Sequence, residues 1–346
     1  MQEHSTEGHP FLSIITGLYN SEPYLAHYVA MLQEQTFTDW EAILVDDGST
    51  DGTCAKVEEL IAKDSRFRLV RKQPEGFPSR SRAVGLSLAR APYVAFVDHD
   101  DFWAPQKLEC QVEALKRYPK PAILHTDRIV WQDREPPQVK YHYSGSMDQL
   151  PIRVQRPEDV IYQGLQIIFS SFLGPKEWVE SVGFHPDMKG VDDFYLFVRL
   201  AQLGPIIRVD LPLTYYYAHG QNLSHSRNIF VEGFYKVYEA LCLDPVPEHV
   251  KRSIHAQACR TEAVSLFATN RKEALRLLLK SLRLYFIPST LNRLLFLIMT
   301  WWIPLSQQEK LFRWVKLVKF KIPTVKDLGL LVRGKQKSYP SREGLH

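Results

Sequence analysis

This chain of 346 residues has only four cysteines, few apolar residues in its first ten positions and no apolar run of membrane-spanning length. The four cysteines are Cys54, Cys110, Cys242 and Cys259. Because none forms a Cys-x-x-Cys spacing, the sequence predicts neither a zinc knuckle nor a disulfide framework, and a reducing compartment fits. Residues 1–10 are polar and lack the apolar segment of a secretory signal peptide. We therefore expect a disordered N-terminus at 1–10 and a cytoplasmic protein.

Charge is distributed unevenly along the chain. Residues 271–346 carry 16 Lys and Arg against 4 Asp and Glu, and since the whole chain is net +4, residues 1–270 are net −8. The hydrophobic share of 45% is ordinary for a globular protein, and the length suits one large domain with an appendage. The cations of the appendage alternate with Leu, Val, Phe and Trp, which suits a membrane surface better than nucleic acid.

The longest apolar run, residues 294–303, ends at Pro304 and falls short of the roughly 20 residues that span a bilayer. Basic residues flank it: Arg271, Lys272, Arg276, Lys280, Arg283 and Arg293 before it, and Lys310, Arg313, Lys316, Lys319 and Lys321 after it. Apolar and Trp residues between Lys/Arg rims are typical of a helix lying in the membrane interface, on its cytoplasmic side here. The alternative is a helical subdomain that packs on the core and presents a solvated basic face, and periodicity does not separate the two.

Short apolar runs alternate with segments of helical length over the first 130 residues. The predicted strands are 12–16, 42–45, 68–70, 93–97 and 122–124, and the predicted helices between them include 22–35 and 79–89. Such alternation predicts an α/β fold with a doubly wound, mostly parallel sheet. We expect this domain to cover 11–227 and a helical, basic region to cover 228–346.

The second half of the expected domain is less regular. Residues 131–165 are rich in Pro, Gly, Tyr and charge and are interpreted as an irregular excursion. The pattern then predicts a strand at 165–173, a helix at 192–203 and a strand at 214–217.

Three carboxylates follow the apolar run 93–97: Asp98, Asp100 and Asp101, with His99 between them. The carboxyl end of a buried parallel strand is where open α/β sheets bind ligands. Crowded carboxylates repel one another, so a hard cation with oxygen ligands would stabilise them there. If the backbone is extended, Asp98 and Asp100 share a face and His99 points away. The alternative is a solvated turn in which Asp101 or an earlier Asp caps a helix ahead of Pro105.

Two other polar clusters stand at predicted strand ends. Residues 19–21, Tyr-Asn-Ser, follow the first strand, and residues 46–49, Asp-Asp-Gly-Ser, follow the second. Because parallel strands end at one edge of a sheet, we expect these clusters and residues 98–101 to form one site.

The ordered motifs resemble those of the family 2 inverting glycosyltransferases, which have the GT-A nucleotide-diphospho-sugar transferase fold. The matching segments are 12–20, 35–41, 45–52, 81–85 and 96–101, and the resemblance covers about residues 11–225. It implies metal-dependent, inverting transfer of a sugar from a nucleotide-sugar donor, expected to be UDP-linked, to a hydroxyl of a glycan or lipid-linked acceptor. The chain departs from the family pattern with Ala83 where Asn is usual, Tyr217 where Arg is frequent, and Tyr195 where an acidic residue is frequent.

The resemblance assigns nucleotide binding to a defined set of residues: Gly17, Tyr19, Asn20, Asp46, Asp47, Arg82, Asp98 and His99. The chemistry is compatible, because a carboxylate such as Asp47 accepts the imino N–H of uracil, Tyr19 lies against a base, and Arg82 suits a phosphate. The alternatives are that residues 46–49 form a turn whose Ser49 or Thr50 caps the following helix, and that His99 packs behind the site.

For the metal and the base, the resemblance implies further roles. Asp100 would ligate Mn²⁺ or Mg²⁺ bridging the diphosphate, His219 would be a second metal or diphosphate contact, and Asp98 would lie near the ribose or a metal-bound water. Asp193 stands at the position of the general base, and Asp192 lies beside it at the acceptor site or acts as a helix cap. Because a helix N-terminus lowers the basicity of a carboxylate, partial desolvation of Asp193 must compensate.

Two other functions share parts of this pattern. A sugar nucleotidyltransferase would carry a Gly-rich, basic loop after the first strand, whereas residues 17–21 are Gly-Leu-Tyr-Asn-Ser. A non-catalytic sugar-nucleotide-binding or membrane-associated assembly protein would not need Asp98, Asp100 and Asp193, all of which are present.

Overall fold

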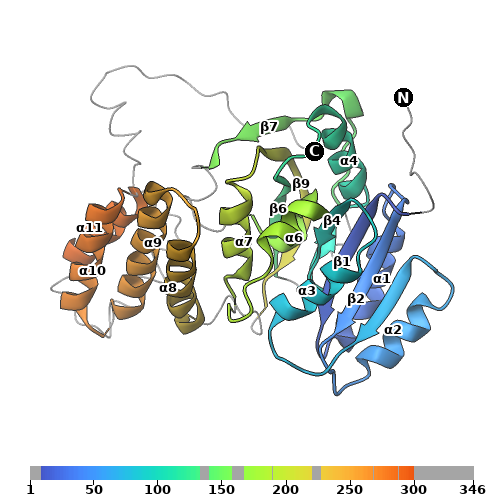
Figure 1. The fold of residues 1–346 in the computed structure, drawn as a ribbon, viewed down its shortest axis with the longest axis horizontal. Helices are drawn as coiled ribbons and strands as arrows, with labels where there is room; N and C mark the ends of the chain where they lie inside the picture. The colour runs from blue at the N-terminus through green and yellow to red at the C-terminus, as the bar shows by residue number, and fades with distance from the viewer. Residues whose placement is uncertain are drawn as a thin grey trace. The chain divides into compact units, whose positions relative to one another are not determined.

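The computed structural model describes residues 9–132, 140–157, 167–188, 190–219, 227–267, 269–286 and 288–299. Within these residues an α/β domain precedes a series of helices (Figure 1). The chain divides within the helix Glu248–Leu266 into two compact units, of which the first ends at Ile254 and the second begins at His255. Most of the segment predicted to be disordered, 1–10, lies outside the described residues.

One sheet organises the first unit. Its strands are β1 Leu12–Leu18, β2 Trp40–Asp46, β3 Phe67–Arg71, β4 Tyr93–Phe96, β5 Phe102–Trp103, β6 Ile123–Trp131, β7 Ile152–Gln155, β8 Phe172–Pro175 and β9 Ile206–Tyr217. The strand order is β3-β2-β1-β4-β8-β6-β9-β5, and β7 pairs with β9. Strands β3, β2, β1 and β4 are parallel, β8 is antiparallel to both neighbours, and β6 and β9 are parallel. The predicted α/β fold with a mostly parallel sheet is confirmed.

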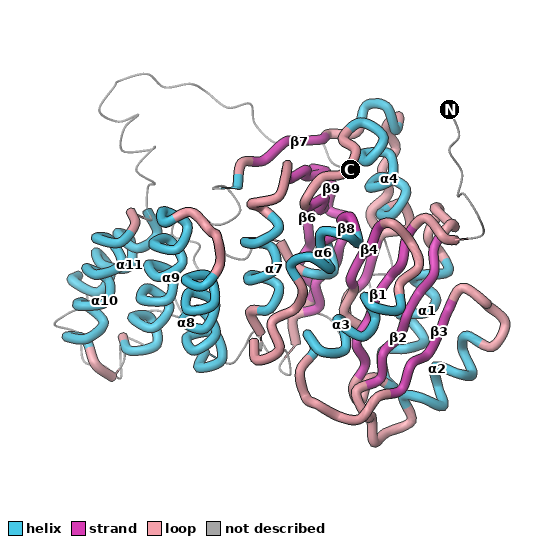
Figure 2. The backbone as a smooth tube through the Cα atoms, in the orientation of Figure 1, coloured by secondary structure: helices cyan, strands magenta, loops and turns pink. Residues whose placement is uncertain are grey.

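Helices cover the sheet on both faces (Figure 2). They are α1 Leu25–Gln33, α2 Thr53–Ile61, α3 Pro78–Leu88, α4 Lys107–Arg117, α6 Lys176–Val182 and α7 Asp192–Leu200, with 3-10 turns at Glu22–Tyr24, Met147–Gln149 and Phe169–Ser171. Alternation along β1 separates the two faces, since Ile14 packs in the core with residues of α1 and α4, whereas Ile15 meets Gly85 of α3. A Cβ at Gly85 would lie 2.4 Å from Ile15 Cγ2, so glycine permits this close approach of α3 to the sheet.

The region 165–175 differs from the predicted strand. Residues 165 and 166 lie outside the described part, Phe169–Ser171 form a 3-10 turn, and the strand is Phe172–Pro175. The Ser171 backbone N–H and hydroxyl both donate to the carbonyl of Ile168, at 3.0 and 2.9 Å, which favours the turn over an extended backbone. Within the segment interpreted as irregular, 131–165, the described part includes β7.

The described part of the C-terminal region, up to residue 299, is helical, as predicted. It contains α8 Arg227–Leu243, α9 Glu248–Leu266, α10 Arg271–Leu284 and α11 Pro288–Met299. In the first unit α8 packs on α7 through the rings of Phe194 and Phe234, whose centroids are 5.2 Å apart. The second unit has a small core of Cys259, Ala263, Phe267, Ala274, Leu277, Leu278 and Leu294.

The apolar run 294–303 is only partly described. Residues 294–299 end α11, and residues 300–346 lie outside the described part, including Pro304 and the basic residues after it. Among the described helices, none is both long enough and apolar enough to cross a membrane.

Candidate active site

The ends of β1, β2 and β4 bring the three polar clusters together. Leu18 pairs with Asp46 across β1 and β2, and the Thr16 hydroxyl donates to the carbonyl of Val97, just after β4, at 2.9 Å. Asn20, whose φ of 49° is left-handed, accepts the Thr50 backbone N–H at 2.9 Å through its side-chain oxygen. The side chain of Asn20 therefore ties the first cluster to the second, in addition to the nucleotide role expected for it.

Asp46 and Asp47 have different local roles. Asp46 closes its own turn by accepting the Ser49 hydroxyl at 2.5 Å and the Ser49 backbone N–H at 3.1 Å. Asp47 is buried and accepts Lys72 Nζ at 2.5 Å and the backbone N–H groups of Glu75 and Gly76 at 2.9 and 2.8 Å. The loop 72–76 thus holds the carboxylate expected to recognise uracil.

The turn at 46–49 does not cap the next helix. That helix, α2, begins at Thr53 after Gly52, and no side chain caps it there. The alternative in which Ser49 or Thr50 is a cap is therefore wrong. Tyr19, just after β1, is 54% exposed, so this end of the strand is open on one side. On the other side it is tightly packed, because a Cβ at Gly17 would lie 3.3 Å from Ser81 Cβ.

Residues 98–101 form a turn rather than an extended segment, because the Asp101 backbone N–H donates to the Asp98 carbonyl at 3.1 Å. Asp98 and Asp100 therefore do not act as a pair on one strand face. Asp98 binds Arg82 at 2.7 Å, whereas Asp100 binds His219 at 2.8 Å. Only the tertiary contacts decide where each carboxylate points.

Asp101 is a buried structural acid and caps no helix, since α4 begins at Lys107 without a side-chain cap. It accepts the Ser170 hydroxyl at 2.5 Å and the Tyr217 backbone N–H at 3.0 Å. Burial, followed by the charges of Asp100 and Asp98, raises the pKa of Asp101 well above its usual value. The predicted capping role is wrong, and the carboxyl instead ties the turn to β9.

Sequence reasoning missed Ser170. Its hydroxyl also accepts the Asp98 backbone N–H at 3.1 Å, and its carbonyl accepts the Trp103 indole N–H at 2.6 Å. Two consecutive serines, Ser170 and Ser171, inside an apolar stretch were the available signal, but the partners of Ser170 lie about 70 positions earlier in the chain.

The Asp100–His219 pair is the best candidate metal site. Asp100 Oδ2 and His219 Nε2 lie 2.8 Å apart, a separation at which both can ligate one ion. Burial raises the pKa of Asp100, but the hydrogen bond from His219 and the charge of His99 outweigh it, so the pKa is lowered and the ligand form is favoured. Among the described residues no three His, Cys, Asp or Glu side chains converge as a metal cluster. A carboxylate oxygen and an imidazole nitrogen would supply two of the ligands of a divalent cation here.

Aromatic side chains surround the Asp100–His219 pair. Tyr24 lies 5.5 Å from the ring of His99 and 6.1 Å from that of His219, measured between centroids. Tyr217, at the position where an arginine is frequent, lies 4.8 Å from His219. His99 therefore packs against Tyr24 at the edge of the site.

Arg82 connects the donor side to the expected base. Its guanidinium binds Asp98 Oδ1 at 2.7 Å and Asp192 Oδ2 at 2.8 Å, and lies 4.1 Å above the Phe169 ring. Burial lowers the pKa of Arg82, but the two carboxylates outweigh it and keep the charge. Asp192 is the first residue of α7 and no side chain caps that helix, so its expected capping role is wrong.

Asp193 has the electrostatics of a base. Burial raises the pKa of its carboxyl to about 8, the charge of Asp192 adds to the effect, and the bond from the Phe194 backbone N–H at 2.7 Å opposes it. The side chain keeps some solvent exposure. Desolvation thus raises the pKa of Asp193 by more than the N-terminus of α7 lowers it.

Comparison with known proteins gives the family context. Residues 13–173 match glycosyl transferase family 2. An uncharacterized glycosyltransferase of Haemophilus influenzae is 39% identical over 103 residues, 30% of this chain and 41% of that protein. Chondroitin synthase of Escherichia coli is 27% identical over 230 residues, 66% of this chain and 32% of that protein. The chain thus spans less than half the length of these two relatives.

Solved structures share the fold. The crystal structure of S. aureus TarS 1-349 in complex with UDP-GlcNAc superposes with a TM-score of 0.60 at 20% identity, covering 82% of this chain and 83% of that one. The mannosyltransferase PcManGT from Pyrobaculum calidifontis, in complex with GDP-Man and Mn²⁺, superposes with a TM-score of 0.55 at 16% identity, covering 95% of this chain and 88% of that one.

Proposed function

Because residues 13–173 of this chain belong to glycosyl transferase family 2, we propose that the protein is an inverting glycosyltransferase that moves a sugar from a nucleotide-diphospho-sugar to a hydroxyl of a glycan or lipid-linked acceptor. One observation carries this proposal: a carboxyl with a pKa of about 8 stands beside Arg82, and Arg82 also holds Asp98 of the turn that bears Asp100. Arg82 thus links Asp192, the neighbour of the proposed base, to the turn that bears the proposed metal ligand.

The geometry suits a proton transfer at Asp193. The acceptor hydroxyl would lie within hydrogen-bond reach of Asp193, which takes the proton as the oxygen attacks the anomeric carbon opposite the leaving nucleotide. Burial raises the pKa of Asp192 and the ion pair with Arg82 opposes that effect, while the charge of Asp192 raises the pKa of Asp193. Asp100 and His219 would hold Mn²⁺ or Mg²⁺, whose charge stabilises the departing diphosphate.

The donor is proposed to be UDP-linked, with Asp47 accepting the uracil imino N–H. Asp47→Asn should weaken UDP binding about tenfold, because a charged acceptor contributes about 1.5–3 kcal/mol and the amide also breaks the contact with Lys72. Isothermal titration with UDP, CDP and GDP measures the affinity and the base preference. Asp127→Asn, which removes an acid on β6 paired with Arg208, is the control. Unchanged UDP affinity in Asp47→Asn would remove Asp47 from the site.

The C-terminal helices are proposed to bind an anionic membrane surface. The exposed side chains of α10 are Lys272, Arg276, Leu279, Lys280 and Arg283, spaced so that they share one face. Glu273, paired with Arg276 at 2.6 Å, is the one acid of α10. Exposed apolar side chains accompany this face in the same unit: Leu279, Phe286, Leu295 and Ile298. Cations mixed with exposed apolar groups suit lipid headgroups.

Charge reversal tests the membrane proposal. The variant K272E/K280E/R283E should bind vesicles containing 30% phosphatidylglycerol at least about 100-fold more weakly than the wild type, because each cation contributes about 1 kcal/mol at such a surface. Flotation of the full chain measures binding, and phosphatidylcholine vesicles should bind little of either protein. The matched control reverses three exposed cations of the first unit, Lys116, Lys120 and Arg153. Equal loss in both triple variants would show that net charge, and not this face, is responsible.

A further inference from the structure

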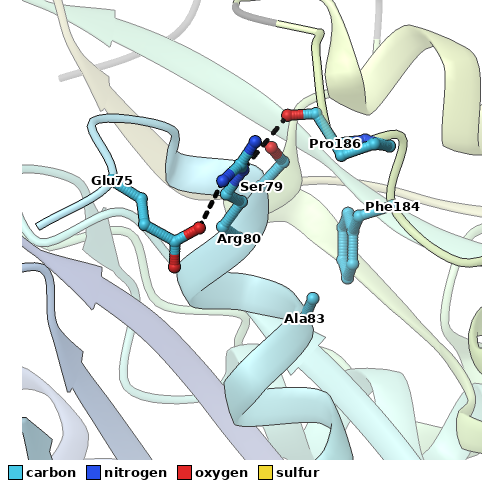
Figure 3. Close-up of a pocket in the computed structure, with 6 residues that line it drawn as sticks. All are labelled: Glu75, Ser79, Arg80, Ala83, Phe184 and Pro186. Carbon is cyan, nitrogen blue, oxygen red and sulfur yellow. Dashed lines mark hydrogen bonds and ion pairs between the residues drawn. The ribbon is translucent and has the colours of Figure 1, made fainter. Parts of the chain in front are cut away.

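A pocket of about 380 Å³ lies between α3 and the segment that follows α6 (Figure 3). Its lining residues are Glu75, Ser79, Arg80, Ala83, Phe184 and Pro186. The volume is in the range of pockets that bind small molecules. None of these side chains is used by the proposed nucleotide, metal or base contacts, so the pocket is a separate feature of the molecule.

Ser79 supplies an unsatisfied polar atom to this pocket. Its side chain is fully buried, and its hydroxyl has no hydrogen-bond partner among the described residues. Buried hydroxyls are nearly always paired, and a serine in a helix usually donates back to a carbonyl of the preceding turn. The residue lines the pocket, but its hydroxyl has almost no exposed surface, so a ligand hydroxyl would become its partner only after a small shift of the pocket wall.

The rim of the pocket is polar but carries no net charge. Arg80 is paired with Glu75, and its Nε donates to the carbonyl of Pro186 at 3.4 Å (Figure 3). The Phe184 ring is held edge-on by Phe96, 5.5 Å away between centroids. An anionic ligand would find the guanidinium already neutralised. An uncharged sugar ring instead suits this lining, which combines the Phe184 ring, the Ser79 hydroxyl and the neutral Arg80–Glu75 ion pair.

The walls of the pocket continue into the proposed active site. Ser79 lies one helical turn before Arg82, and the segment with Phe184 and Pro186 leads into Asp192. The ion pair between Arg82 and Asp192, at 2.8 Å, joins α3 to the first residue of α7. A ligand here would be positioned by the same two segments that hold the base.

We propose that this pocket binds an uncharged saccharide unit of the acceptor, next to the unit whose hydroxyl faces Asp193. This inference rests on the proposed glycosyl transfer. The side chain of Ala83 is a single methyl group exposed at the pocket, and its small size leaves the pocket volume free for a ligand. A longer side chain at that position would occupy the saccharide volume.

Binding of simple glycosides to the full chain tests the proposal without a donor. The probes are methyl β-glucoside, methyl β-galactoside and methyl N-acetyl-β-glucosaminide, with methyl β-glucuronide as the anionic member, titrated by ligand-observed NMR. We expect at least one neutral glycoside to bind the wild type, and Ala83→Gln to weaken it at least tenfold. Ser87→Gln, on an exposed position of the same helix, is the matched control and should bind as the wild type does.

A second variant separates binding from folding. Ser79→Ala should weaken the glycoside about fivefold, the loss of one neutral hydrogen bond, with Tm unchanged or raised because the hydroxyl has no partner in the free protein. A lower Tm would show that the hydroxyl is structural and would overturn the inference. So would wild-type affinity in Ala83→Gln, the absence of binding by every neutral glycoside, or tighter binding of the glucuronide.

The two proposals fail in different ways. Release of UDP from a panel of UDP-sugars reports glycosyl transfer or hydrolysis without reference to the pocket. Donor turnover without glycoside binding overturns the pocket inference alone. Glycoside binding without turnover of any donor overturns the proposed function and leaves a saccharide-binding pocket.

Discussion

Asp193→Asn is expected to lower the transfer rate by about 10²- to 10⁴-fold, the usual contribution of a general base, while UDP affinity stays within about twofold of the wild type. The amide is nearly isosteric, and the bond from the Phe194 backbone N–H to Oδ1 can remain. What is lost is the ability to take the proton of the acceptor hydroxyl. Turnover of the donor with acceptor, measured beside UDP titration, separates the two effects.

The pH profile gives the same variant a second readout. The pKa of Asp193 is raised to about 8, so the carboxyl is protonated and inactive as a base below that pH. The wild-type rate should therefore rise about tenfold per pH unit from pH 6 to near 8 and then level off, whereas the residual rate of Asp193→Asn should be flat. Glu180→Gln, an exposed acid on α6 paired with Lys176, is the control and should keep the wild-type profile. A pH-dependent residual rate in Asp193→Asn would assign the base elsewhere.

Asp100→Ala is expected to abolish metal-dependent turnover, with a loss of about 10³-fold or more. Removing this carboxylate leaves His219 as the single protein ligand of the proposed pair. Because the metal is proposed to carry the charge of the departing diphosphate, several kcal/mol of transition-state stabilisation depend on it.

Metal titration makes the assignment specific. The wild type should show saturable activation by Mn²⁺ and loss of activity on chelation, and Asp100→Ala should require far more Mn²⁺ or show none. Asp127→Ala, which removes an acid of β6 outside the site, should titrate as the wild type does. Full activity of Asp100→Ala with the wild-type Mn²⁺ dependence would eliminate Asp100 as a ligand.

The sheet was predictable because its signals are local. The strands β1, β2 and β4 are apolar runs buried on both faces, and with the edge strand β3 they form the parallel part of the sheet. The polar clusters at the ends of these strands were identifiable for the same reason. The second half of β6 was missed because it is less apolar and less buried than its first half. For β9 the prediction covered only 214–217 and missed residues 206–213, in which buried apolar residues alternate with Arg208, Asp210 and Pro212.

The contacts inside the site were not predictable in this way. An extended Asp98–Asp100 segment was assumed from sequence spacing, but the Asp101 N–H closes a turn and sends the carboxylates to different partners. Ser170 lies 69 positions from Asp101, and no local pattern identified it. His219 was identified through the family resemblance, but it lies 119 positions from Asp100, so the sequence did not show that the two side chains pair. Asp192 was expected to be a helix cap because acids are frequent there, yet the ion pair with Arg82 takes precedence.

The sequence by itself indicated which residues could perform the chemistry and at which edge of the sheet they would lie. It could do so because an apolar strand and the polar residues that follow it form a local pattern of a few residues. The tertiary structure alone decided which carboxylate does what. Burial and the charge of Asp192 raise the pKa of Asp193, and burial with the charges of Asp100 and Asp98 raises that of Asp101. For Asp100 the hydrogen bond from His219 and the charge of His99 outweigh burial, so its pKa is lowered. These differences in pKa depend on desolvation and on partners distant in the chain, and the residue type Asp by itself does not reveal them.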